Sequence, residues 1–142
     1  MESFLKDFKT IAAAAATAAG TGQVNSSIID ATGYDRVAFI VHLGVVTDAS
    51  LINVAIQDSA DNANTNMTNV GVTANLNAAT SSNTAILVEA LGAQKRYVRC
   101  IVNRATQNAA ISAITCLLGG TKGKPVTADT SISASNSAVA TG

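Results

Sequence analysis

Three strand-length apolar segments follow one another between Thr84 and Leu118, and they constrain the fold more than any other feature of the chain. They cover 85–88, 97–102 and 110–118, with polar connections at 92–95 and 104–108. Apolar runs of this length, separated by short polar connections, are typical of consecutive antiparallel strands. This region therefore predicts an antiparallel meander and, with it, an all-β domain.

Alternating patterns predict further strands before this region. The clearest covers 36–43, whose alternate residues form two apolar faces. Other predicted strands cover 24–30 and 51–57, with a short edge strand over 67–72. A turn is predicted over 30–35, where Gly33 supplies a positive φ and the Asp30 carboxylate caps the turn. Short strands with frequent turns and no strong internal helix indicate a two-sheet antiparallel β-sandwich.

Residues 1–22 carry a helical pattern instead. Phe4, Leu5 and Phe8 recur at helical spacing, and the run 12–19 is almost all alanine, the best helix former, before glycines end it. We expect an N-terminal arm or short helix ahead of the sandwich. Two interpretations stay open, because the arm can dock its large apolar side chains on a partner or pack them against its own domain.

The chain divides by composition into an arm (1–22), a sandwich (23–125) and a C-terminal tail (126–142). The tail is rich in Ser, Thr and Ala without an apolar period, so we expect it to be extended or flexible. A signal peptide is another interpretation of the arm. Glu2 and Asp7 speak against it because they interrupt the basic segment with which a signal peptide begins, and alanine makes a weak hydrophobic segment.

The chain carries no net charge and few charged residues. Nine basic and nine acidic residues cancel, and charged residues make up 13% of the chain, about half the usual share. A neutral chain offers no general attraction to nucleic acid or to an anionic membrane. With 4% aromatic residues and no Trp, it has few side chains for stacking on sugars or bases. A surface with few charges and small side chains is typical of a protein whose surface is covered by binding partners.

Residues that carry chemistry are sparse. His42 is the only histidine, and no carboxylate, Cys or second His lies near it in sequence, so neither a catalytic triad nor a zinc site is predicted. We expect Cys100 and Cys116 to be buried free thiols. A cross-strand disulfide is the alternative if the register places them side by side.

Two loops resemble ligand-binding motifs only superficially. The loop 58–66 contains Asp and Asn but lacks the residue order and the closing Glu of a calcium loop. The segment 119–125 contains Gly-Lys, but Pro125 replaces the Ser or Thr of a phosphate loop. No cofactor, no metal ion and no enzymatic activity are therefore predicted.

Lys95, Arg96, Arg99 and Arg104 form a basic cluster around one predicted strand. The cluster can be a charged edge that blocks unwanted strand pairing, or a set of ion-pair donors for a carboxylate-rich partner. RNA binding is a third interpretation, which the neutral overall charge and the few aromatic residues disfavour.

Several turn and strand-entry motifs resemble those of one family. They are 30–35 (Asp-Ala-Thr-Gly-Tyr-Asp) leading into 36–39, the loop 57–61, the strand entry 94–99 (Gln-Lys-Arg-Tyr-Val-Arg), and Gly119-Gly120 with Pro125. In these motifs, which span most of its length, the chain resembles the capsid cement, or decoration, proteins of tailed bacteriophages. The likeness is strongest to the jelly-roll type of a Bordetella short-tailed phage. It implies a jelly-roll topology for the sandwich, and the alanine run 12–19 is not part of the shared pattern.

The resemblance implies a structural function. Copies made in the host cytoplasm would bind the outer surface of an icosahedral phage head, contact the major capsid protein and stabilise the shell against its packed DNA. They would also pair with one another as two-fold dimers, or alternatively as trimers. The candidate capsid contacts are Phe4, Leu5 and Phe8, with Arg96 and Arg99 as secondary candidates.

The main alternative is a tail, fibre or receptor-binding β-sandwich of a phage virion. Two further classes are weaker. A secreted adhesin needs a working signal peptide, and an enzyme needs a site assembled from residues that are distant in sequence.

Overall fold

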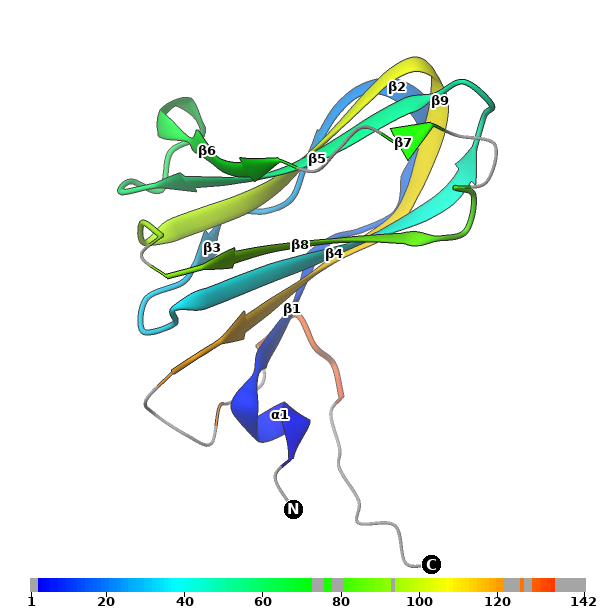
Figure 1. Ribbon diagram of the computed structural model, residues 1–142. Helices are drawn as coiled ribbons and strands as arrows, with labels where there is room; N and C mark the ends of the chain where they lie inside the picture. Colours follow the sequence, from blue (N-terminus) through cyan, green and yellow to red (C-terminus); the bar gives the residue numbers. More distant parts are fainter. Residues whose placement is uncertain are drawn as a thin grey trace, which may run out of the picture.

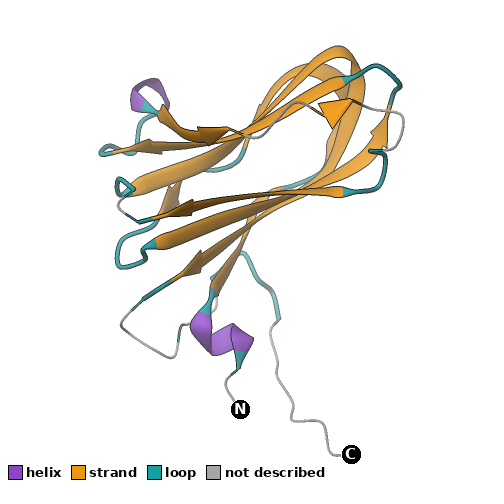
Figure 2. Ribbon diagram, in the orientation of Figure 1, coloured by secondary structure: helices purple, strands orange, loops and turns teal. Residues whose placement is uncertain are grey.

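The computed structural model describes residues 3–72, 76–77, 81–92, 94–121, 126 and 129–134. These residues form a two-layer antiparallel β-sandwich with barrel-like closure and a short helix near the N-terminus (Figure 1). Strands dominate both layers, and helical turns lie only at the periphery (Figure 2). The jelly-roll-like form confirms the predicted fold class.

The elements follow one another along the chain with short connections. They are α1 (Phe4–Asp7), β1 (Lys9–Ala14), β2 (Thr17–Asn25), β3 (Ile29–Asp30), β4 (Arg36–Val46), β5 (Leu51–Ser59), the 3-10 helix η1 (Asn64–Asn66), β6 (Thr68–Val72), β7 (Leu76–Asn77), β8 (Ala85–Leu91) and β9 (Tyr97–Gly119).

Both layers are built on the long strand β9. The part of β9 up to Ala105 pairs with β5, and the part from Ala109 onwards pairs with β4. β6 and β7 extend the first layer beyond β5, whereas β8 extends the second layer beyond β4. Thr106, with a φ of 71°, lies between the two parts, where β9 bends from one layer into the other (Figure 1).

The meander predicted between Thr84 and Leu118 is wrong. Two of its three segments belong to β9, and the polar residues 104–108 continue the strand through the bend instead of forming a turn. Residues 105–108 are exposed there because neither layer covers the bend, so polar side chains are compatible with strand structure. The remaining segment, 85–88, lies in β8, which pairs with β4 and not with β9.

The helix expected from the alanine run 12–19 is also wrong, because β1 and β2 cover this run. β1, β2 and β3 pair with β9 in succession along the edge opposite β4 and β5. A short alanine helix is marginal in water, and here the backbone ladder with β9 and the burial of Ile11 and Ala13 outweigh helix propensity. Only α1 is helical in the predicted arm, so most of the described part of 1–22 belongs to the sandwich.

The other predicted strands are confirmed, with shifts at their ends. β4 and β5 extend the predicted 36–43 and 51–57, β6 is an edge strand, and 24–30 is split between β2 and β3. The predicted turn is present as well: Gly33 has a φ of 86°, and the Thr32 N–H donates a hydrogen bond of 3.0 Å to Asp30 Oδ1.

The core lies between the layers and takes most of its residues from β4, β5 and β9. In β4, Val37, Phe39 and Val41 are fully buried, while the side chains between them lie on the outer face. The largest fully buried side chains are Phe39, Ile52, Ile56, Ile111, Ile114 and Leu118.

Arg104 joins β2 to the bend of β9. Its guanidinium is buried and donates hydrogen bonds of 2.7 to 3.3 Å to four backbone carbonyl oxygens, those of Ala18, Thr21, Gly22 and Ala109. The register of β2 on β9 shifts twice in this stretch, so these carbonyls lie where the regular ladder is interrupted. Arg104 therefore satisfies backbone acceptors where the ladder is interrupted, one of them the buried carbonyl of Ala109, and is not part of an exposed basic cluster.

The described part of the tail lies against β1. Lys9 Nζ lies 3.3 Å from a carboxylate oxygen of Asp129, and the Ala12 N–H donates a hydrogen bond of 3.0 Å to Ser131 Oγ. These contacts occupy the outer edge of β1. Most of the predicted tail 126–142 lies outside the described residues.

Candidate docking surface

The outer face of the β8–β4–β9–β1 layer carries several neighbouring apolar side chains. The alternation that buries Phe39 in β4 turns Ile40 outward, where it is opposite Leu87 of β8. In the same way, Ala38 lies opposite Leu117 of β9. Leu87 is 69% exposed. Adjacent exposed apolar side chains on neighbouring strands are characteristic of an interaction site rather than of a freely solvated surface.

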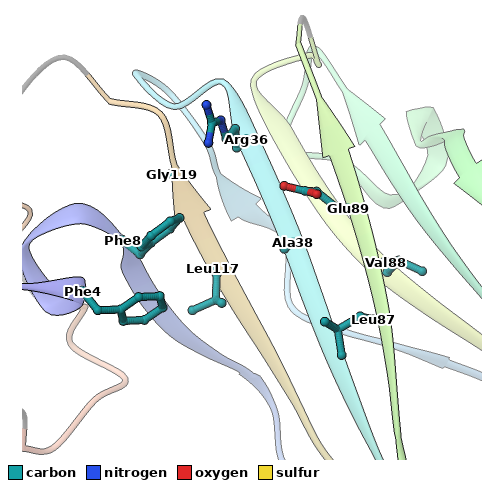
Figure 3. A pocket seen from close by; sticks show the side chains of 9 residues that line it. All are labelled: Phe4, Phe8, Arg36, Ala38, Leu87, Val88, Glu89, Leu117 and Gly119. Atoms are coloured by element: carbon teal, nitrogen blue, oxygen red, sulfur yellow. The ribbon is translucent and has the colours of Figure 1, made fainter.

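A groove crosses this face between α1 and β8. It has a volume of about 460 Å³. Phe4 and Phe8 form one wall, Leu117 and Ala38 form the floor, and Leu87 lies on the opposite wall (Figure 3). We call it the outer groove.

The aromatic wall depends on a glycine. The rings of Phe4 and Phe8 stack with their centroids 4.7 Å apart, one helical turn from each other. A Cβ at Gly119 would lie 2.7 Å from the Phe8 ring, so only glycine lets this ring lie against β9. Phe4 stays 54% exposed and offers its ring to an occupant of the groove.

Two charged side chains, Arg36 and Glu89, line the upper part of the outer groove (Figure 3). Arg36 Nε lies 4.0 Å from a carboxylate oxygen of Asp35, and both side chains are well exposed, so this contact adds little stability and leaves Arg36 able to bind an occupant. The groove therefore suits a largely apolar partner segment with polar groups at one end.

Of the predicted contact residues, Phe4 and Phe8 line the outer groove and Leu5 does not. Arg96 is bound within the chain: its Nη2 lies 2.8 Å from Asp30 Oδ2, and its guanidinium lies 4.9 Å from the centre of the Tyr97 ring. The hydrogen bonds from Arg96 hold the pKa of the Asp30 carboxyl well below its usual range.

Arg99 lies in the other layer and is only 6% exposed. Its Nε donates a hydrogen bond of 2.8 Å to Gln57 Oε1, and its Nη1 donates one of 2.6 Å to Asn64 Oδ1. Among the described residues no carboxylate lies within ion-pair distance of Arg99. The predicted contact residues are therefore not one surface, because the structure separates the phenylalanines from the arginines.

The groove also contains residues that were not among the predicted contacts, namely Leu87, Leu117 and Gly119. For Leu87 and Leu117, the signal was the apolar character of both faces of segments 85–88 and 110–118. In a strand that is buried on one face only, apolar residues would alternate with polar residues.

Both cysteines are buried free thiols, as predicted. Burial raises the pKa of Cys100 to about 12 and raises the pKa of Cys116 as well. No disulfide links them, and they lie in the two different halves of β9.

We expect both thiols to resist alkylation in the folded protein. At about pH 8, the thiolate of Cys100 is about a thousandfold scarcer than that of a thiol with the ordinary pKa of 9.0, and its sulfur is shielded as well. Iodoacetamide labelling followed by mass spectrometry checks this, with the urea-unfolded chain as the control that labels twice. Rapid labelling of the folded chain contradicts the expectation.

No group of three or more His, Cys, Asp or Glu side chains among the described residues is placed to hold a metal. His42 is exposed on β4, opposite Ala85 and Ala113. Residues 122–125 of the segment compared with a phosphate loop lie outside the description. No helix in the described ranges has the length and apolar character needed to cross a membrane.

Comparison with known proteins adds no identification. No protein-family model matches the chain, and a search of curated proteins finds no relative.

Proposed function

We propose that this chain is a structural protein of a phage virion that binds the outer surface of an icosahedral head. It contacts the major capsid protein, ties neighbouring capsid subunits together and pairs with copies of itself. It acts without a cofactor or catalysis. The shell gains stability against the pressure of packed DNA because many copies each add modest contacts over a closed surface.

The observation that supports docking is the outer groove. Phe4, Phe8 and Leu87 are partly or largely exposed around it, in a chain with few aromatic residues. An apolar side chain of a capsid subunit fits this floor, while Arg36 and Glu89 can pair with polar groups of the same segment. The jelly-roll-like sandwich supplies a rigid support for the groove. The family resemblance supplies the identity of the partner.

The direct test is co-sedimentation of the purified chain with phage heads assembled without it. We expect saturation at a copy number that matches a repeating site over the whole shell. Saturation at a few copies, or no binding, contradicts the proposal and favours the tail, fibre or receptor-binding alternative.

We expect Phe4→Ser to weaken head binding by about tenfold or more, because the exposed ring loses its burial in the complex. The domain should stay folded, since Phe4 lies outside the core. Val70→Ser is the matched control, because Val70 is 45% exposed but lies on β6 in the other layer. If heads bind Phe4→Ser as tightly as the unchanged chain, docking does not use the outer groove.

A further inference from the structure

β8 is an edge strand whose backbone is open on one side. It pairs with β4 from Ala85 opposite His42 to Leu91 opposite Arg36, without a register shift. The Leu43 N–H donates to Thr84 O at 2.8 Å, and the Gly92 N–H donates to the carbonyl oxygen of Asp35 at 3.0 Å.

These two bonds fix the direction of each backbone group in β8. Residues of an antiparallel strand point alternately to its two neighbours, so the even-numbered residues from 84 to 92 face β4. Ala85, Leu87, Glu89 and Leu91 therefore direct their N–H and C=O groups to the open side. Within the described part of the chain, none of these groups has a hydrogen-bond partner there.

Two other edges of the sandwich are guarded against pairing, as edges usually are. β6 is short, carries Gly71, and its register with β5 shifts between Ile56 and Gln57. The edge of β1 is occupied by the contacts of Lys9 and Ala12 with the tail. β8 has no proline, no lysine and no bulge, and Leu87 and Leu91 are 69% and 70% exposed.

We propose that β8 pairs with β8 of a second copy, antiparallel and around a two-fold axis at Val88. This register places Ala85 opposite Leu91 of the second copy and Leu87 opposite its Glu89, so every open backbone group of β8 gains a partner. An axis at Leu87 leaves Leu91 unpaired. An axis at Glu89 sets the two Glu89 carboxylates against each other, which is unfavourable for directly opposite residues.

The pairing joins two layers into one continuous sheet, β1–β9–β4–β8 followed by the same strands of the second copy in reverse order. The apolar outer faces then meet at Leu87 and Leu91, and the two outer grooves lie on one side of the dimer. Main-chain bonds along an added strand supply affinity, and the opposed side chains supply the register. The inference deepens the self-association named in the proposed function, but its argument rests on β8 alone.

The test is the mass of the purified full chain in solution, by light scattering and sedimentation. We expect a dimer, twice the chain mass of 14.3 kDa. Leu87→Glu places a carboxylate opposite Glu89 of the second copy, twice per dimer, and should raise the dissociation constant by about tenfold or more. Leu87→Lys places an ammonium group opposite the same carboxylate and should keep the dimer.

The double variant of Leu87→Glu with Glu89→Lys should recover the dimer, because the opposed charges again attract. Val70→Glu, on the guarded β6 edge, is the control and should remain dimeric. Circular dichroism confirms that each variant is folded, as expected for substitutions at exposed positions.

A monomeric wild-type chain overturns the proposal, and so does a dimer that Leu87→Glu leaves intact or that the double variant does not recover. Phage heads take no part in this assay. A dimer that fails to bind heads therefore contradicts the proposed function alone, and a monomer that binds heads contradicts the β8 pairing alone.

Discussion

Replacement of Arg104 by Met is expected to lower the free energy of unfolding by about 3 to 5 kcal/mol. The guanidinium is 8% exposed and serves four carbonyl oxygens where β2 and β9 depart from a regular ladder. Methionine fills much of the same volume but donates no hydrogen bond, so all four acceptors lose this partner and the Ala109 carbonyl is left unsatisfied inside the protein. Urea unfolding followed by circular dichroism measures the change.

Arg96→Met is the matched control for Arg104→Met. Arg96 also forms charged hydrogen bonds, but its side chain is 57% exposed, and its ion pair with Asp30 is screened by solvent. We expect Arg96→Met to cost much less stability than Arg104→Met, because exposed ion pairs contribute little. Equal losses in the two variants would show that Arg104 does not hold the bend.

Phe39→Ala is expected to lower the free energy of unfolding by about 3 to 5 kcal/mol. Phe39 is the largest of the fully buried side chains, and it lies on β4 between β8 and β9. Removal of the ring loses its burial and leaves a cavity that a two-layer sandwich cannot close completely. Thermal and urea unfolding measure the effect.

Val45→Ala on the same strand separates burial from strand propensity. Val45 is 67% exposed, so its truncation should change the free energy of unfolding by no more than about 0.5 kcal/mol. A large effect of Val45→Ala, or a small effect of Phe39→Ala, would mean that the two faces of β4 are assigned the wrong way round.

The parts of the fold that the sequence predicted are those governed by neighbouring residues. The alternation in 36–43 predicts a strand because side chains of a strand point to opposite faces, and the Gly33 turn follows from the φ that glycine allows. The same local reasoning wrongly predicted a helix over the alanine run 12–19. Its propensity is helical, but β9 offers it a backbone ladder that no local pattern reveals.

The candidate site was predicted only in part. Phe4 and Phe8 are conspicuous as large apolar side chains in an otherwise polar or alanine-rich arm. Leu87 and Leu117 join them because β4 lies between β8 and β9 and brings distant segments to one face. Arg99 illustrates the reverse case, since a residue expected on the surface is held by Gln57 and Asn64 from other elements.

The sequence by itself determined the all-β class, the strands at 36–43 and 51–57, and the glycine turn at Gly33. These follow from residue types and from a period of two, which act over a few residues. Only the tertiary structure decided that one strand spans both layers, that the alanine run is extended, that Arg104 is internal and that β8 is an open edge. Each of these depends on which segments pair, and strand pairing is settled by the combined burial and hydrogen bonding of residues far apart in the chain.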